Sequence, residues 1–288
     1  MSKVGIIGGS GCYNIEGIEK VKRVKIKTPF GEPSDELITG MLEDREVVFL
    51  ARHGKGHRVS PSEINYRANI YAMKKLGVER IISVSACGSL KKELKPLDIV
   101  IPDQFVDRTN SARKTTFFES GIVAHIQFAE PVCPILSKAL YDAGRESGAV
   151  MHLGGAYVNM EGPQFSTKAE SKLYRSWGMD IIGMTNLAEA RLAREAEICY
   201  SCMACVTDYD CWHMDESTET VSVEMIINNL LKNVETSKNI LKKVMPALGD
   251  SRTCACSSAL KHAIITRPEA IPAETKKRLG LIIGKYII

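Results

Sequence analysis

The stretch from Ile198 to Asp210 reads Ile-Cys-Tyr-Ser-Cys-Met-Ala-Cys-Val-Thr-Asp-Tyr-Asp, a long apolar run that ends in two acids. An apolar run of this length, followed by polar residues, predicts a buried strand. Because side chains alternate along a strand, we expect Asp208 and Asp210 to leave by the same face, with Tyr209 opposite. Two carboxylates side by side on one face repel each other, so one of them should have a raised pKa. Such a pair could give a proton to a nitrogen leaving group and accept a hydrogen bond from an exocyclic amine.

Strand-like and helix-like segments alternate along the whole chain. This alternation predicts an α/β fold, with a mixed or largely parallel sheet covered by helices. The predicted strands are Val4–Ile7, Val47–Ala51, Ile81–Ala86, Ile99–Ile101, Tyr157–Met160, Ile181–Met184 and Ile198–Thr207. The predicted helices are Glu63–Leu76, Pro134–Gly148, Thr167–Trp177, Leu187–Glu195, Val221–Met245 and Ala273–Lys285. The polar stretch 249–258 is the one candidate boundary, so we predict a main domain over residues 1–248 and an extension over 249–288.

Composition narrows the class of protein. The chain has 288 residues, a formal net charge of +4 and 44% hydrophobic residues, which is ample for a large core. It has no block of Lys and Arg that would bind nucleic acid. No apolar run reaches the roughly 20 residues that span a bilayer, and no leader peptide precedes the first strand. We therefore expect a soluble cytoplasmic protein that binds neither nucleic acid nor a membrane.

Nine cysteines are many for such a protein. Cys199, Cys202 and Cys205 are spaced like metal ligands, but on a strand the middle one faces away from the other two. They cannot converge on one metal, and we interpret them as small buried side chains. The Cys254-Ala255-Cys256 motif lies in a polar stretch, where a redox or disulfide role is credible.

Hydrogen-bond donors follow several predicted strands. Gly8-Gly9-Ser10-Gly11 follows the first strand; it matches neither a Walker loop nor a dinucleotide fingerprint and could also be an ordinary tight turn. In such sheets ligands gather at the carboxyl ends of the strands. The donors from four strand ends would form an oxyanion site without a metal: Ser10, Arg52, His53, Ser85 and Thr185.

Two aromatic side chains are ambiguous when considered alone. Phe165 lies in Glu161-Gly162-Pro163-Gln164-Phe165-Ser166 and could pack against a purine, although a core position is the more ordinary interpretation. His125 has apolar neighbours, which favours a structural histidine.

Together these pieces resemble the purine nucleoside phosphorylase family, and within it the members that cleave 5′-methylthioadenosine. The matching stretches lie between about residues 4 and 245 and include Gly5–Gly11, Thr28–Asp35, Leu50–Gly54, Ala86–Leu90, Asp98–Thr109, Ala129–Pro134, Glu161–Ser171 and Thr207–Trp212. The resemblance implies a single α/β domain with a twisted mixed sheet, assembled as a homotrimer or homohexamer. It also implies phosphate attack on the ribosyl C1′, which yields adenine and 5-methylthioribose 1-phosphate, in methionine and purine salvage. Phosphate is then a co-substrate, and no cofactor or metal is expected.

The resemblance also implies roles for individual residues. Asp208 would share a proton with purine N7, and Asp210 would support it and accept from the 6-amino group. His125 would reach a neighbouring subunit's methylthio pocket. Phosphate contacts would fall on Ser10, Arg52, His53, Ser85, Ala86 and Thr185. Met184 would lie under the ribose and Phe165 beside the purine. Ser166 and Val223 match positions that set the substrate range, with Ile226 and Ile227 nearby.

The C-terminal CxC motif resembles thermophilic archaeal members of the family, which use intracellular disulfides, and Cys133 with Cys199 is the pairing we predict for one bridge. Three other functions stay open. A 6-aminopurine nucleoside phosphorylase of broad specificity would also cleave adenosine. A nicotinamide-dependent oxidoreductase would use the glycine-rich turn, although its register is wrong. A non-catalytic thiol switch or metal protein would depend on the cysteines.

Overall fold

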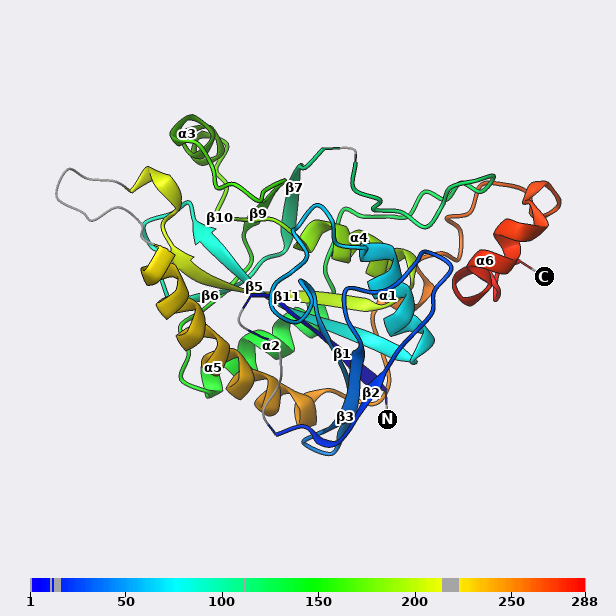
Figure 1. Cartoon of the computed structure of the whole chain (residues 1–288), viewed down its shortest axis with the longest axis horizontal. Coiled ribbons are helices and arrows are strands. Elements are labelled where there is room, and N and C mark those ends of the chain that lie inside the picture. The colour runs from blue at the N-terminus through cyan, green and yellow to red at the C-terminus, as the bar shows by residue number, and fades with distance from the viewer. Residues whose placement is uncertain (1, 11, 13–16, 111, 214–222, 288) are drawn as a thin grey trace.

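A mixed sheet runs through the middle of the molecule, with helices on both of its faces (Figure 1). The computed structural model describes residues 2–10, 12, 17–110, 112–213 and 223–287, and this part of the chain contributes eleven strands to the sheet. The strands are β1 (Lys3–Gly8), β2 (Glu19–Val24), β3 (Leu37–Leu42), β4 (Arg45–Ala51), β5 (Val78–Ser89), β6 (Ile99–Ile101), β7 (Gln104–Arg108), β8 (Met151–Leu153), β9 (Ala156–Met160), β10 (Ile181–Gly183) and β11 (Cys199–Asp208).

The helices confirm the predicted alternation. They are α1 (Tyr66–Lys75), α2 (Pro134–Glu146), α3 (Lys168–Ser176), α4 (Asn186–Glu195), α5 (Val223–Ala247) and α6 (Ala273–Ile283), with short 3₁₀ turns η1 (Asp210–Trp212), η2 (Ala255–Ser258) and η3 (Pro268–Ala270). None of the helices in the described ranges combines the length and the apolar character that crossing a lipid bilayer requires.

The strand order brings several strand ends to one edge. Along the main path the order is β2-β3-β4-β1-β5-β10-β9-β7, and β11 pairs with β5 and β6, with β8 beyond β6. Strand β1 is parallel to β4 and β5, and β5 is parallel to β11. The carboxyl ends of these four strands therefore share an edge of the sheet, which is where ligands of such sheets bind.

Strand β5 carries the sheet past this edge. Its pairing with β1 ends at Val84, and its last residues, Gly88 and Ser89, pair antiparallel with β10. Because β5 changes its pairing partner here, β10 and the start of α4 lie beside the ends of β1, β4 and β11.

Strand β11 is apolar along most of its length because both of its faces are covered. Cys202, Ala204 and Val206 belong to the core on the side of α1 and α4, whereas Met203 and Cys205 belong to the core on the side of α2 and α5. Figure 1 shows α2 and α5 together on one side of the sheet and α1 and α4 on the other. A strand that is covered on both faces carries few polar side chains, and those it has need buried partners, as the Ser201 hydroxyl has in Ser137 at 2.9 Å.

Four strands escape the sequence patterns. Strand β2 is almost entirely exposed and reads Glu-Lys-Val-Lys-Arg-Val, which is a charged edge rather than an apolar run. Strands β3, β7 and β8 are short or partly exposed, and they form because neighbouring strands supply hydrogen-bond partners. The fold class, a single mixed sheet flanked by helices, is nevertheless the predicted one.

Candidate active site

A cavity of about 260 Å³ opens where the strand ends meet. Most of the predicted site residues line it, although they come from distant parts of the chain. Those residues are Ser10, Arg52, His53, Ser85, Ala86, Phe165, Met184, Thr185, Asp208, Asp210 and Ile226. The structure therefore brings together the predicted oxyanion donors and the predicted acid pair in one site.

Three predicted residues do not line the cavity. Ser166 lies next to it, and its hydroxyl lowers the pKa of Asp210. Val223 begins α5, but its side chain lies outside the described residues. His125 is exposed, and its backbone amide donates to the Ala263 carbonyl at 2.8 Å. The interpretation as a buried structural histidine is thus wrong, because the side chain is exposed although its neighbours Ala124 and Ile126 pack against the core.

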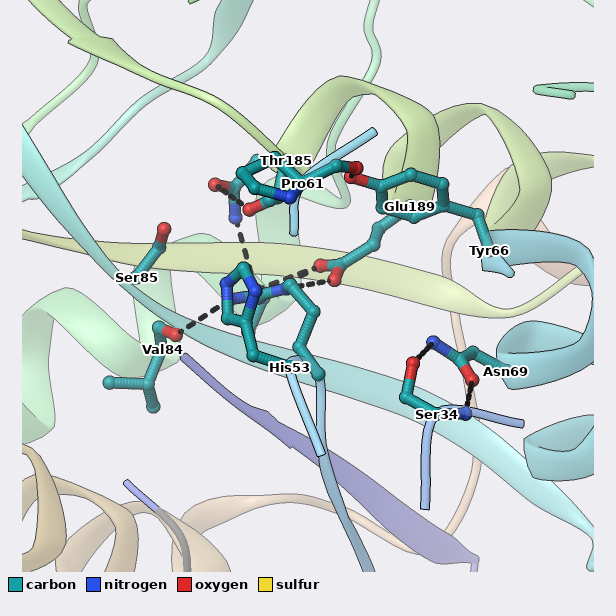
Figure 2. A network of polar contacts seen from close by, with 12 residues as sticks. Ser34, His53, Pro61, Tyr66, Asn69, Val84, Ser85, Thr185 and Glu189 are labelled. Carbon is teal, nitrogen blue, oxygen red and sulfur yellow. Dashed lines mark hydrogen bonds and ion pairs between the residues drawn. The ribbon is translucent and has the colours of Figure 1, made fainter. Parts of the chain in front are cut away.

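Arg52 is the buried centre of the donor end. Its guanidinium is 1% exposed and forms an ion pair with Glu189 of α4, with a second contact between Nη2 and Oε2 at 3.2 Å. Nη1 donates to the Val84 carbonyl at 3.4 Å. Figure 2 shows Val84, Ser85, Thr185 and Glu189 around His53 in this region. Burial lowers the pKa of Arg52, but the attraction and hydrogen bonds of Glu189 outweigh the effect of burial. The pKa of Arg52 is therefore raised, and the guanidinium stays charged.

The glycine-rich turn allows Arg52 to lie there. A Cβ on Gly9 would be 2.7 Å from the Val84 carbonyl oxygen and 2.8 Å from Nη1 of Arg52, so any side chain would displace one of them. The Gly9 amide donates to Val84 and the Arg52 amide to Gly8, which fixes the turn beside the guanidinium. A tight turn at Gly8 and Gly9 is therefore compatible with an anion site beside Arg52.

Helix α4 adds a further source of positive potential. Thr185 is its N-cap residue and is buried, and its hydroxyl makes no capping hydrogen bond to the helix. The N-terminus of a helix carries unsatisfied amides and a partial positive charge, which favours an anion. Ser85 is also buried at the cavity wall, so the residues Ser85 and Thr185 line the cavity together with Arg52.

His53 differs from the expected second donor. Its Nδ1 lies 2.8 Å from the Val59 carbonyl and must carry the ring proton to make that bond, which leaves Nε2 as an acceptor in the neutral ring. Burial and the charge of Arg52 lower the pKa of His53 to about 4, so the ring is neutral at pH 7. A neutral His53 thus offers Nε2 as an acceptor for an O–H and has no second N–H to donate to an anion.

Both acids have raised pKa values, where only one was expected to, and the main cause is not the expected repulsion. Strand β11 ends at Asp208, and Asp210 starts η1 with a φ of +49°, so the prediction that both leave one face of a strand is wrong. Both still line the cavity because the chain turns back on itself. Burial is the main cause of the raised pKa of each acid, and repulsion from Asp210 adds only a smaller share at Asp208.

The hydrogen bonds around Asp208 have room for a proton. The Thr207 hydroxyl lies 2.7 Å from Oδ2 of Asp208 and 3.2 Å from the Cys87 carbonyl. A hydroxyl has one proton and can donate to only one of these acceptors. Thr207 therefore donates either to Asp208, which favours the ionised acid, or to the Cys87 carbonyl, which leaves the Asp208 carboxyl free to carry a proton.

The end of β11 is held in place by α5. Asn229 donates to the Thr207 carbonyl at 2.8 Å, and Asn233 donates to the Val206 carbonyl at 2.9 Å. The Thr207 carbonyl lies at the register shift between β11 and β5, where buried backbone groups need other partners, and the Val206 carbonyl also accepts from the Leu97 amide at 2.9 Å. Helix α5 thus positions the acid pair while Ile226 and Leu230 present an apolar wall to the cavity.

The remaining wall has an exposed aromatic ring and a clamped methionine. Phe165 is 64% exposed at the cavity, so its interpretation as a core residue is wrong and its face is available to a flat ring. Glu161 is held in an ion pair with Arg113 at 2.9 Å, and Arg113 also donates to the Met184 carbonyl. Arg113 thus links the backbone at Met184 to the loop that carries Glu161.

Sequence reasoning missed Glu189, Arg113, Asn229 and Asn233. Glu189 and the two asparagines lie on helices whose apolar periodicity was clear, and the only signal is a polar residue on the apolar face. Arg113 lies in an irregular segment and gives no such signal. Its role depends on contacts with residues about 50 and 70 positions away.

A comparison with family models matches residues 3–246 to the phosphorylase superfamily. The chain belongs to this superfamily. The S-methyl-5′-thioadenosine phosphorylase of Geobacter sulfurreducens is 59% identical over 284 residues, which is 99% of each chain. A methylthioadenosine phosphorylase from an antarctic soil metagenomic library has a solved structure with 48% identity, a TM-score of 0.92 and 98% coverage of both chains.

A third relative is more distant. A mutant of the adenosine/methylthioadenosine phosphorylase of Schistosoma mansoni, solved with methylthioadenosine, is 38% identical with a TM-score of 0.84, over 91% of this chain and 96% of that one. The predicted closeness of the tail to archaeal members of the superfamily finds no support, since bacterial relatives match this chain over nearly its whole length.

Proposed function

We propose that the chain catalyses the phosphorolysis of 5′-methylthioadenosine to adenine and 5-methylthioribose 1-phosphate. The observation that carries this proposal is a single cavity with buried oxyanion donors and an acid pair with raised pKa values. Relatives of the same length that bear this activity in their names support it.

The donor end would hold phosphate for attack on the ribosyl C1′. A phosphate oxygen forms the new bond to C1′ as the bond from C1′ to N9 of the purine breaks. Arg52, Thr185 and the α4 N-terminus are fixed before substrate arrives, so they position the nucleophile without reorganising. Glu189 neutralises part of the Arg52 charge, which leaves the phosphate negative enough to stabilise the cationic sugar.

The acid end would receive the purine. The electron pair of the broken bond moves to the purine, and Asp208 supplies a proton at N7. Asp210 is buried, and its Oδ2 has no hydrogen-bond partner among the described residues. That oxygen is the natural acceptor for the 6-amino group of adenine, because an unpaired buried acceptor is costly until a ligand satisfies it.

The apolar wall would select the 5′ group. Ile226 and Leu230 lie one turn apart on α5 and offer a thioether an apolar contact that a hydroxyl would not gain. This favours methylthioadenosine over adenosine. The proposal assigns no cofactor to the cavity.

Two further predictions accompany this function. We propose that the protein is a cytoplasmic homo-oligomer, a trimer or hexamer. The exposed side chain of His125 is compatible with a role in a neighbouring subunit's methylthio pocket.

An adenine-release assay tests the proposal. Methylthioadenosine should yield adenine only when phosphate or arsenate is present, without added metal, and adenosine should react more slowly. Release of adenine in phosphate-free buffer would instead indicate a hydrolase, and equal rates with both nucleosides would favour the broad-specificity alternative.

A further inference from the structure

Four cysteines gather far from the cavity, at the other end of β11. Cys133 is the N-cap residue of α2, Cys199 is the first residue of β11, and Cys254 and Cys256 flank the start of η2. Their Sγ atoms all lie within 4.8 Å of one another. A strand of this length separates them from Asp208 by roughly 30 Å, so they have no part in the phosphorolysis site.

The spacing of the sulfur atoms suits one metal ion. The Sγ atoms of Cys199 and Cys254 are 3.3 Å apart, well beyond the ~2.05 Å of a disulfide bond. Zinc binds thiolate sulfur at about 2.3 Å, and a tetrahedron of that radius places its corners roughly 3.8 Å apart. All nine cysteines lie in the described part of the chain and each is a free thiol, so the predicted bridge between Cys133 and Cys199 is not formed.

The place of the cluster in the fold suits a negatively charged group. Cys133 is the N-cap residue of α2. The N-terminal end of α2 stabilises negative charge at the same position. Three of the four cysteines are buried, which keeps solvent from a bound ion.

Arginines fix the segment that carries two of the cysteines. Arg80 donates to the Ser251 carbonyl at 2.8 Å, and Arg252 donates to the Glu197 carbonyl at 2.7 Å. Both arginines line a cavity of about 270 Å³ that also borders Cys133, Cys199 and Cys254. Arg252 also pairs with Glu79 at 3.5 Å, so Arg80 is the better placed of the two to offset the negative charge that four thiolates around a divalent ion would leave.

We propose that Cys133, Cys199, Cys254 and Cys256 bind one zinc ion in a closed structural site. Zinc displaces the four thiol protons, and no electron transfer is involved. The ion joins the C-terminal stretch to the sheet, because two ligands precede α6 and two belong to the body of the fold. Cys202 and Cys205 lie outside the cluster, and Cys199 meets its partners from other segments of the chain.

Metal analysis of the full-length chain tests this site. The protein is purified without chelator and with any affinity tag removed, and zinc is measured by mass spectrometry. We expect about one zinc per chain in the unmodified protein and none after the double substitution Cys254→Ser and Cys256→Ser. Cys205→Ala is the matched control, since Cys205 lies on the same strand and in the same core as Cys199 but outside the cluster. This control should keep its zinc.

Two further measurements decide the outcome if the double variant does not fold. Cobalt added to the chelator-treated native protein should give the intense visible absorption of a tetrahedral thiolate site. Alkylation after denaturation with chelator should find all nine cysteines as thiols. A native protein that holds no zinc, or that holds iron in its place, overturns the proposal, as does a thiol count lowered by disulfides.

Discussion

The backbone amide of Asp210 donates a hydrogen bond to Oδ1 of Asp208 over 2.8 Å, so the two acids form one unit. That bond and the Thr207 hydroxyl favour the ionised form of Asp208, yet burial outweighs them and the pKa is raised. The unit therefore presents a carboxyl that can hold a proton beside a carboxylate that can accept a hydrogen bond.

Asp208→Asn should lower kcat/KM for methylthioadenosine by about 10²–10⁴-fold, the usual range for losing a general acid. An amide cannot transfer a proton to N7, although it keeps the shape of the acid. Steady-state adenine release measures the effect, and an unchanged melting temperature shows that the fold is intact. Full activity in this variant would show that Asp208 is not the general acid.

The same acid predicts a pH dependence of activity. A raised pKa keeps Asp208 protonated to higher pH than an ordinary aspartate, and activity is lost once that proton leaves. We therefore expect kcat/KM to fall as the pH rises through the raised pKa of Asp208. The falling limb should be absent from the residual activity of Asp208→Asn, and its persistence would assign the limb to another group.

Glu189→Gln should weaken phosphate binding and destabilise the fold. The substitution leaves the buried Arg52 charge without its partner, which costs about 3–5 kcal/mol of unfolding free energy. The KM for phosphate should rise more than the KM for the nucleoside. Asp142→Asn, in an exposed pair with Lys138, is the control and should change neither quantity. Equal changes in both KM values would mean that Glu189 supports the fold without positioning Arg52.

Glu195 predicts a pH dependence of stability. Burial raises its pKa from 4.5 to about 7, although the Phe117 amide and the Thr116 hydroxyl donate to it. The folded form therefore holds a proton that the unfolded form releases near pH 4.5. This contribution is fully present below pH 4.5 and is lost as the pH rises to about 7, with a total of ~3 kcal/mol.

Denaturant unfolding at several pH values checks the Glu195 prediction. Glu195→Gln should be less sensitive to pH between 5 and 8 than the unmodified chain. Identical pH profiles would show that Glu195 titrates normally.

Phe165→Ala should separate binding from stability. Its ring is exposed, so the unfolding free energy should change by no more than about 0.5 kcal/mol. Loss of stacking against the purine should raise the KM for methylthioadenosine about 2- to 10-fold. Leu173→Ala, at an exposed position of α3 outside the cavity, is the control. A KM unchanged by Phe165→Ala would place the purine elsewhere.

Much of the fold follows from local pattern, and the exceptions have physical causes. β11 and the helices around it carry strong apolar periodicity, which is why their existence could be predicted. Strand β2 could not, because a charged edge strand has no apolar pattern and depends on its pairing with β3. The end of β11 was misjudged because the left-handed turn at Asp210 leaves no trace in an alternating sequence.

The site shows the same division. Strand-end residues such as Arg52 and Thr185 could be predicted because the carboxyl ends of parallel strands lie at the same edge of the sheet. Glu189 could not, since its importance depends on which face of α4 meets Arg52. The cysteine cluster was missed for a similar reason, because its ligands are separated by more than 120 positions and meet only in the folded chain.

A crystal structure with methylthioadenosine and sulfate, which stands in for phosphate, tests the central claim most directly. We predict sulfate among Arg52, Ser85 and Thr185, and purine N7 within hydrogen-bond distance of the Asp208 carboxyl, with C1′ between them. A nucleoside whose C1′ faces away from the sulfate, or a purine bound away from Asp208, would contradict the account.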